Sequence, residues 1–204
     1  DEFIKENPNI TITQTLSGRY IIGYIDKSHY DDLLSYLSTS FISSAPVILG
    51  TLDRPPLDSA GIIPVHNQPY LDLKGRGKIQ FIYDQTAEGD PPDGFFFGHE
   101  YNNEQINSAL SSENPHDIVP EHDKSGHGTF LASVAAGREI DDFSGAAPEA
   151  DIIAVKLKKA RPFYLEKFCV PDQQEYAFES SAVMVGIEYI IKKAHELKRP
   201  VVIC

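Results

Sequence analysis

The stretch that decides the fold is DKSGHGT, residues 123–129, which runs directly into FLASVAAG, residues 130–137. Ala, Ser and Gly dominate the second segment, so we expect a helix buried tightly in a core, with Gly128 packed too closely to tolerate valine. His127 stands at the start of this helix between two glycines, which lets another backbone or a substrate approach the imidazole. The helix dipole disfavours a positive charge there, which keeps the ring neutral and able to accept a proton. These features predict a general base on a rigid helix.

Residues 125–129, SGHGT, resemble the histidine motif of the subtilisin-like serine proteases. Two further matches strengthen the likeness. FSGAAPEADIIAVKL, residues 143–157, is similar to the turn and buried strand that follow the histidine helix in that family. YDQT at residues 83–86 and FGHEY at residues 97–101 resemble an insert found in the germination-type branch of spore-forming bacteria. The resemblance covers residues 69–203 well and the N-terminal part loosely.

The resemblance implies an α/β fold: a subtilisin-like doubly wound parallel sheet, present in part, preceded by a small α+β prodomain-like unit. It also implies serine-type peptide-bond hydrolysis, in which a serine attacks the carbonyl, His127 takes its proton, an aspartate holds the ring and an asparagine stabilises the oxyanion. The serine and the asparagine would lie beyond Cys204. We therefore expect an incomplete, inactive fragment of an endopeptidase, with His127 as its one placed catalytic residue. The alternative is a non-catalytic pseudoprotease that acts as a binding or regulatory module.

The triad aspartate is the main departure from the family pattern. Gly77 runs directly into KIQFIYDQT, residues 78–86, where the family has a buried strand that ends in Asp-Ser/Thr-Gly. In one interpretation the aspartate-bearing strand is absent, and this segment is a later strand. In the other, residues 78–83 are the family strand and Asp84 is the catalytic aspartate. Gln85 and Thr86 replace the small residue and glycine of the turn, and the strand alternates in polarity, so the first interpretation is favoured.

Three regions are predicted along the chain. Residues 1–52 read as a small α+β unit, which by position is either a prodomain or an accessory domain. Residues 53–77 are a linker punctuated by proline and glycine. Residues 78–204 are a partial catalytic domain. Within the first region we expect strands at residues 10–14, 19–25 and 45–50, and a helix from Ser28 to about Tyr36.

The region after the histidine helix predicts a right-handed βαβ unit. Its parts are a buried parallel strand at residues 151–157, a helix at residues 175–196 and a strand at residues 201–203. The apolar stripe of the helix is predicted to comprise Ala182, Val185, Ile187, Ile190, Ile191 and Ala194. This order favours a doubly wound sheet independently of the motif.

Residues 87–122 form a long polar and aromatic insert, which we expect at the periphery of the domain with one short surface helix at residues 103–110. His122 and Asp123 lie close to His127, but their spacing is not that of a zinc-binding His-Glu-x-x-His helix. We therefore expect no metal and no cofactor. Asp123 is expected to fix the turn before the helix.

Composition narrows the class of partner. The formal net charge of −12 argues against nucleic acid and anionic membrane surfaces, because both need basic patches. Protein or peptide substrates are expected instead. The two cysteines, Cys169 and Cys204, are too few for a disulfide framework. No apolar run approaches the roughly 20 residues of a membrane helix. The negative charge is compatible with a secreted or spore-associated protein. The chain begins without Met or a signal-peptide pattern and stops within an apolar run, so both ends look cut.

Overall fold

The computed structural model describes residues 8–18, 20–29, 47–49, 77–121, 123, 126–139, 143–171 and 176–204. Its contacts group into two compact units that do not follow the order of the chain. Unit 1 comprises Asp1–Gly50, Asp93–Phe96 and Leu157–Cys204, and unit 2 comprises Thr51–Pro92 and Phe97–Lys156. The predicted boundaries at residues 52 and 77 fall within or next to residues outside the described part, as does the linker between them, and they stay predictions.

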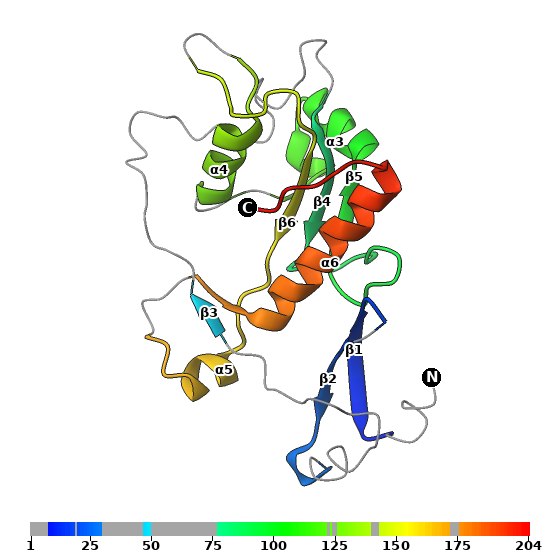
Figure 1. The fold of residues 1–204 in the computed structure, drawn as a ribbon, viewed down its shortest axis with the longest axis vertical. Coiled ribbons are helices and arrows are strands. Elements are labelled where there is room, and N and C mark those ends of the chain that lie inside the picture. The colour runs from blue at the N-terminus through cyan, green and yellow to red at the C-terminus, as the bar shows by residue number, and fades with distance from the viewer. Residues whose placement is uncertain are drawn as a thin grey trace. The chain divides into compact units, whose positions relative to one another are not determined.

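Unit 2 is built on a three-stranded mixed sheet. In Figure 1, β4 (Ile79–Asp84) lies between β5 (His99–Asn102) and β6 (Ile152–Lys156). The β4–β6 pair is parallel and the β4–β5 pair is antiparallel. β6 is the parallel strand expected near residues 151–157, although all of its residues are half-buried rather than fully buried. The fold is therefore α/β with a sheet that contains a parallel pair.

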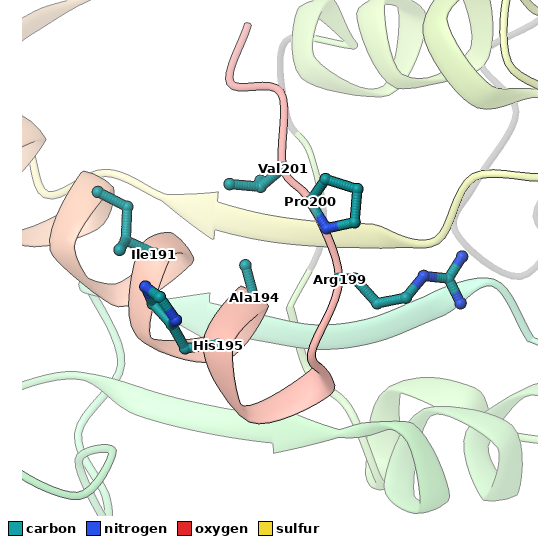
Figure 2. Close-up of a pocket in the computed structure, with 6 residues that line it drawn as sticks. All are labelled: Ile191, Ala194, His195, Arg199, Pro200 and Val201. Atoms are coloured by element: carbon teal, nitrogen blue, oxygen red, sulfur yellow. The ribbon is translucent and has the colours of Figure 1, made fainter.

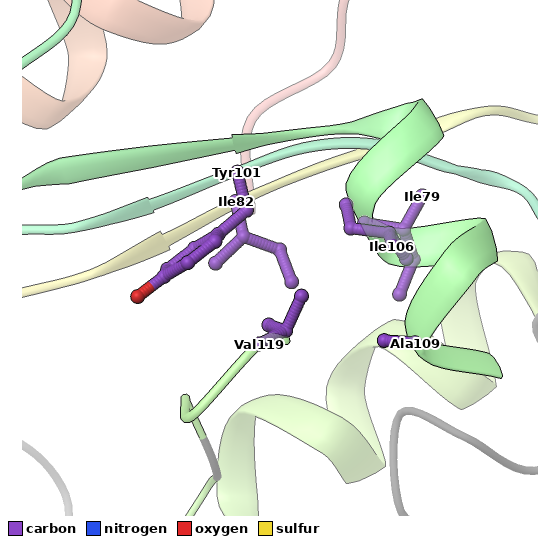
Figure 3. Packing of buried hydrophobic residues seen from close by; sticks show 6 residues of the cluster. All are labelled: Ile79, Ile82, Tyr101, Ile106, Ala109 and Val119. Atoms are coloured by element: carbon purple, nitrogen blue, oxygen red, sulfur yellow. The ribbon is translucent and has the colours of Figure 1, made fainter. Parts of the chain in front are cut away.

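The core of unit 2 lies between this sheet and helix α3 (Asn103–Leu110), as Figure 3 shows. The helix starts with a capping box, because the Asn102 side chain accepts from the Gln105 backbone while the Gln105 side chain accepts from the Asn102 backbone. Its buried face meets the sheet and the segment that follows the short helix η3 (Pro115–Asp117). The buried members of this cluster are Ile79, Ile82, Tyr101, Ile106, Ala109 and Val119.

The helix predicted at residues 103–110 is confirmed with the same bounds. The peripheral placement of the insert is wrong, because residues 99–102 add an edge strand to the sheet and α3 supplies Ile106 and Ala109 to the core. The expectation failed because β5 is a short strand whose polar residues give no apolar run of their own. Its pairing with β4 decides its conformation.

The N-terminal strands belong to unit 1. β1 (Ile10–Leu16) and β2 (Tyr20–Ile25) form the antiparallel hairpin predicted from the sequence, with the turn at Ser17 and Gly18. β3 (Val47–Leu49) occupies the third predicted strand, and it pairs with β7 (Ala177–Glu179) far along the chain. Lys27–His29 is a short 3₁₀ helix, and the rest of the helix predicted from Ser28 lies outside the described residues.

The long helix of unit 1 is α6 (Ser180–Leu197). It begins five residues later than predicted because residues 177–179 pair as β7. Ile187 and Ile191 of the predicted stripe are exposed, while Tyr189 is fully buried and packs edge-on against Phe95 at 5.7 Å between ring centroids. Ala182, Val185 and Ala194 of the predicted stripe are buried, so the prediction is confirmed for these three residues, and Tyr189 belongs to the same buried face. No described helix combines the length and apolar character that a membrane crossing requires.

The strand predicted at residues 201–203 is wrong. This segment follows α6 without regular structure, and Val202 is 93% exposed. A strand needs a hydrogen-bonded neighbour, and within the described part of the chain these residues pair with none. The βαβ unit is therefore not closed here by its second strand.

Arg161 connects the start of α5 (Pro162–Lys167) with β7 and β2 in unit 1. It donates through Nε to Glu179 Oε1 at 2.7 Å and through Nη2 to Oε2 at 3.0 Å. Its guanidinium also lies over the Tyr24 ring of β2, 4.4 Å from the ring centroid. The Glu179 side chain is only 10% exposed, so this pair satisfies a carboxylate that would be costly to bury alone.

Replacing Arg161 with Met should destabilise the chain by about 2 kcal/mol, because it leaves the Glu179 carboxylate buried without its bidentate partner. The measurement is the free energy of unfolding in urea. Lys167→Met is the matched control, because Lys167 is exposed and lies over the Phe168 ring at 5.5 Å. The control should change the stability by less than about 0.5 kcal/mol. Equal effects of the two variants would contradict a stabilising role for the Arg161–Glu179 ion pair.

Candidate active site

His127 is the first residue of helix α4 (His127–Ala136), as the motif predicts. The preceding Gly126 is the N-cap, with a φ of 74° in the left-handed region. A non-glycine residue there would cost about 1–2 kcal/mol. The glycine is therefore required by the backbone conformation that turns the chain into the helix. The histidine is half-buried and its Nδ1 is shielded from solvent, so the ring does not project into bulk water.

Asp123 holds the N-terminal end of this helix. Its Oδ1 accepts from the Gly126 N–H at 2.9 Å, and its Oδ2 accepts from the Thr129 N–H at 2.9 Å and the Thr129 hydroxyl at 3.0 Å. The carboxylate thus satisfies backbone donors at the positive end of the helix dipole. This confirms the expectation that Asp123 fixes the turn, and it fixes the backbone on both sides of His127.

Lys78 holds the other end of α4. It is 3% exposed, and its ammonium donates to the carbonyls of Ala136, the last helical residue, and of Pro148. A buried ammonium is tolerated only when its hydrogen bonds are satisfied. Carbonyl oxygens at a helix C-terminus carry the negative end of the dipole and suit that role. The helix that presents His127 is therefore gripped at each end by a charge of the appropriate sign.

The packing of α4 differs from the expected tight burial on all sides. Ser133 and Ala136 are buried, whereas Phe130, Leu131 and Val134 are 39–44% exposed. Within the described residues one face of the helix is covered and the other is open. The steric expectation for Gly128 is wrong for the same reason: a Cβ there would meet Asp123 Oδ2 at 3.5 Å, an ordinary contact.

The glycines that do pack closely follow the helix. A Cβ on Gly145 would lie 2.5 Å from the Gly137 nitrogen, 2.8 Å from the Gly137 oxygen and 2.9 Å from the Ser133 oxygen, all of them backbone atoms. The Gly145 N–H also donates to the Gly137 carbonyl at 2.9 Å. Residues 143–147 thus return along the end of α4 at a distance that only glycine permits.

Asp84, the candidate triad aspartate, ends β4 and is 5% exposed. Its Oδ1 accepts from the Thr86 N–H at 2.7 Å and from the Thr86 hydroxyl at 2.6 Å. Its Oδ2 lies 3.6 Å from the ammonium of Lys156, its neighbour in the parallel register. The described contacts of Asp84 do not include His127, so the structure favours the interpretation in which this segment is not the aspartate-bearing strand.

A partly buried charged cluster lies at the ends of β4 and β6. The Lys156 ammonium lies 3.4 Å from Glu121 Oε1, and the Glu121 side chain is 9% exposed. Burial raises the pKa of Glu121; Lys156 opposes that shift, while Asp84 and Asp123 add to it. Burial also raises the pKa of Tyr101, with further contributions from Asp84 and Glu121. The cluster joins the sheet edge to the segment that leads into His127.

Sequence reasoning missed Lys78, Glu121 and Lys156. The available signal was weak: Lys78 and Lys156 each stand at one end of an otherwise mainly apolar strand segment, where a lysine is usually solvated. Glu121 lies in a polar loop and gives no pattern. Their roles depend on contacts between residues far apart in the sequence, which spacing does not encode.

The described residues contain no group that could hold a metal ion. No group of three or more His, Cys, Asp or Glu side chains there is arranged to hold a metal ion. Figure 2 shows a hollow in unit 1 at the end of α6, lined by Ile191, Ala194, His195, Arg199, Pro200 and Val201. Its walls hold neither a carboxylate nor a hydroxyl that could pair with His195, so the chemistry of interest stays with His127.

Comparison with known proteins places this geometry in a family. The chain belongs to the subtilase family, Peptidase S8, which matches residues 28–168. The match starts further toward the N-terminus than the resemblance read from the motifs and ends before α6. The CspB protease of Clostridium perfringens is a similar solved structure, with 30% sequence identity and a TM-score of 0.52. The alignment covers 67% of this chain and 25% of that one, so this chain spans about a quarter of the relative's length. No protein with a curated description matches.

Gly145→Ala should destabilise the chain by about 1–3 kcal/mol, since the new methyl group would force backbone atoms apart. Gly128→Ala is the matched control and should be neutral or stabilising by up to about 1 kcal/mol, because alanine favours helix. Urea unfolding of both variants provides the measurement. A larger loss for Gly128→Ala than for Gly145→Ala would show that the packing around α4 is not as described.

Glu121 should make the stability of the chain depend on pH. The folded state raises its pKa above the ordinary value of 4.5, so its contribution is fully present below pH 4.5 and is lost as the pH rises through the raised pKa. The stability of the wild type relative to Glu121→Gln should therefore fall over that interval. Urea unfolding between pH 4 and 7 measures it. Glu113→Gln, at an exposed glutamate, controls for net charge. A difference that grows with pH would contradict the sign.

Proposed function

We propose that this protein acts as a subtilisin-like serine endopeptidase in which His127 is the general base. One observation carries the proposal. The half-buried His127 is the first residue of α4, and Asp123 holds the backbone before and after it by accepting from the Gly126 and Thr129 N–H groups. A base must be held in place to take a proton from a nucleophile. Membership of the subtilase family supports the same chemistry.

In this proposal a serine attacks the peptide carbonyl and His127 takes the serine proton, while an aspartate orients the ring and an asparagine amide stabilises the oxyanion. Of these groups, His127 is the one that we assign to a residue of this chain. Asp84 is committed to Thr86 and Lys156. In subtilisin, loss of the serine alone lowers kcat by about 2 × 10⁶ and loss of the aspartate by about 3 × 10⁴. Residues 1–204 by themselves are accordingly proposed to be inactive.

The finer family assignments are also proposals. The germination-type branch and a secreted or spore-associated location are proposed from the motifs at residues 83–86 and 97–101 and from the negative net charge. The parallel β4–β6 pair is compatible with a doubly wound sheet. The β1–β2 hairpin and β3 fit the proposed prodomain-like character of residues 1–52. Protein or peptide substrates follow from the proposed chemistry.

The alternative proposal is a pseudoprotease that keeps the fold to bind or regulate a partner. The engagement of Asp84 by Lys156 favours it, because the strand that follows Gly77 then offers no aspartate to His127. In that case the grip on α4 would serve to keep a binding surface in shape. The two proposals differ in whether the complete protein contains a reactive serine.

A fluorophosphonate probe separates them, because it labels a serine only when a base activates it. The complete gene product should be labelled, its His127→Ala variant should not, and residues 1–204 alone should not. His116→Ala, at an exposed histidine in η3, is the matched control and should be labelled like the wild type. A folded, complete protein that resists labelling would leave the binding proposal standing.

A further inference from the structure

The segment that leads into His127 is held at three successive points. Val119, 2% exposed, packs in the hydrophobic core of unit 2. Glu121 contacts Lys156 at the end of β6. Asp123 holds the Gly126 and Thr129 amides at the start of α4. The first contact is apolar and the third is a helix cap, so the second is the one that sets where this segment stands over the sheet edge.

The Lys156 ammonium forms ion pairs with two carboxylates, those of Asp84 and Glu121. Asp84 is fixed by two hydrogen bonds to Thr86, and it lies 3.6 Å from the ammonium. Glu121 lies 3.4 Å from the same ammonium on a side chain that is 9% exposed. Because Asp84 is held by Thr86 at the end of β4, it fixes the position of the Lys156 ammonium at the end of β6. The position of this ammonium in turn fixes where the Glu121 carboxyl group lies. Removing the ammonium would leave Glu121 without the group that opposes its shift, so that burial and the Asp84 charge would raise the pKa of Glu121 further.

The energetics argue against a purely stabilising role for Glu121. The groups that face it are Lys156 of β6, Asp84 of β4, Tyr101 of β5 and Asp123 of its own segment. Burial and the two carboxylates together outweigh the attraction of Lys156, and the pKa of Glu121 is raised. A buried ion pair whose attraction does not exceed its desolvation cost adds little stability, and in some proteins such a pair selects one geometry instead.

We propose that Glu121, acting through Lys156, is a positioning residue for His127: the pair fixes the position of Glu121 relative to the sheet edge, and so the direction in which helix α4 presents the imidazole. This inference rests on the proposed function, because it assigns the pair a use only if His127 must meet a substrate or a nucleophile. Its central claim concerns the geometry of the segment.

The test compares Glu121→Gln with Glu113→Gln in the full 204-residue chain. Three quantities are measured: the free energy of unfolding, the exchange rates of the Gly126 and Thr129 amides, and the side-chain NMR signals of His127. Glu121→Gln should leave stability at neutral pH unchanged or raised, because the buried charge is removed. It should speed exchange of the two amides by about tenfold or more and shift the His127 signals, whereas Glu113→Gln should do neither.

Two Lys156 variants complete the test. Lys156→Arg keeps the positive charge and should retain slow exchange, whereas Lys156→Met should behave like Glu121→Gln in its amide exchange. Unchanged exchange and His127 signals in Glu121→Gln would overturn the proposal. It would also be overturned if exchange increased at all amides in proportion to a loss of global stability, since that marks a merely structural pair.

These readouts do not depend on activity, so they decide the positioning role even if the complete protein resists the fluorophosphonate probe. If the complete protein is labelled, Glu121→Gln should lower its kcat for peptide hydrolysis with little change in KM, because the base is misplaced while substrate contacts remain. A change in KM alone would count against the proposal.

Discussion

The structure around His127 depends on opposite charges at the two ends of one short helix. Asp123 accepts hydrogen bonds from the first amides of α4, and Lys78 donates to its last carbonyl. Each helix end leaves four backbone groups without intrahelical partners. A carboxylate at the N-terminus or an ammonium at the C-terminus satisfies these groups with strong, charge-assisted hydrogen bonds. A helix of 10 residues is marginal in isolation. The two charges therefore add to the packing of Ser133 and Ala136 in stabilising this segment as a helix.

The rest of unit 2 supports those two anchors. Lys78 directly precedes β4, the central strand, so the C-terminal grip on α4 is as rigid as the sheet. Asp123 follows a segment that is pinned to the core by Val119 and to the sheet edge by Glu121. The close return of Gly145 along the helix end adds a backbone contact. The apolar side chains Phe130, Leu131 and Val134 on the other face are exposed, so the described anchors of the helix lie on its covered face and at its ends.

The parts of the structure that could be predicted from sequence are those encoded by neighbouring residues. The GHGT motif with its alanine-rich continuation predicted α4, alternation and a turn predicted the β1–β2 hairpin, and an Asn-x-x-Gln capping pair marks the start of α3. The failures are contacts between distant segments. β5 and β7 are short strands whose extended conformation depends on pairing with β4 and β3, which lie elsewhere in the sequence. Ile187 of α6 is exposed, while Tyr189 packs against Phe95 on the buried face. The Lys78 and Lys156 contacts were missed for the same reason.

The question of the triad aspartate shows why a residue type in a suitable position is not enough. Asp84 ends the central strand and is almost fully shielded, as a triad aspartate would be. A catalytic aspartate uses one oxygen to accept from the histidine Nδ1–H, whereas the described contacts of Asp84 go to Thr86 and Lys156. An ion pair with lysine would also compete with the imidazolium that forms during proton transfer. The described contacts of Asp84 suit a fixed point beside Lys156 at the end of the central strand, and they do not include His127.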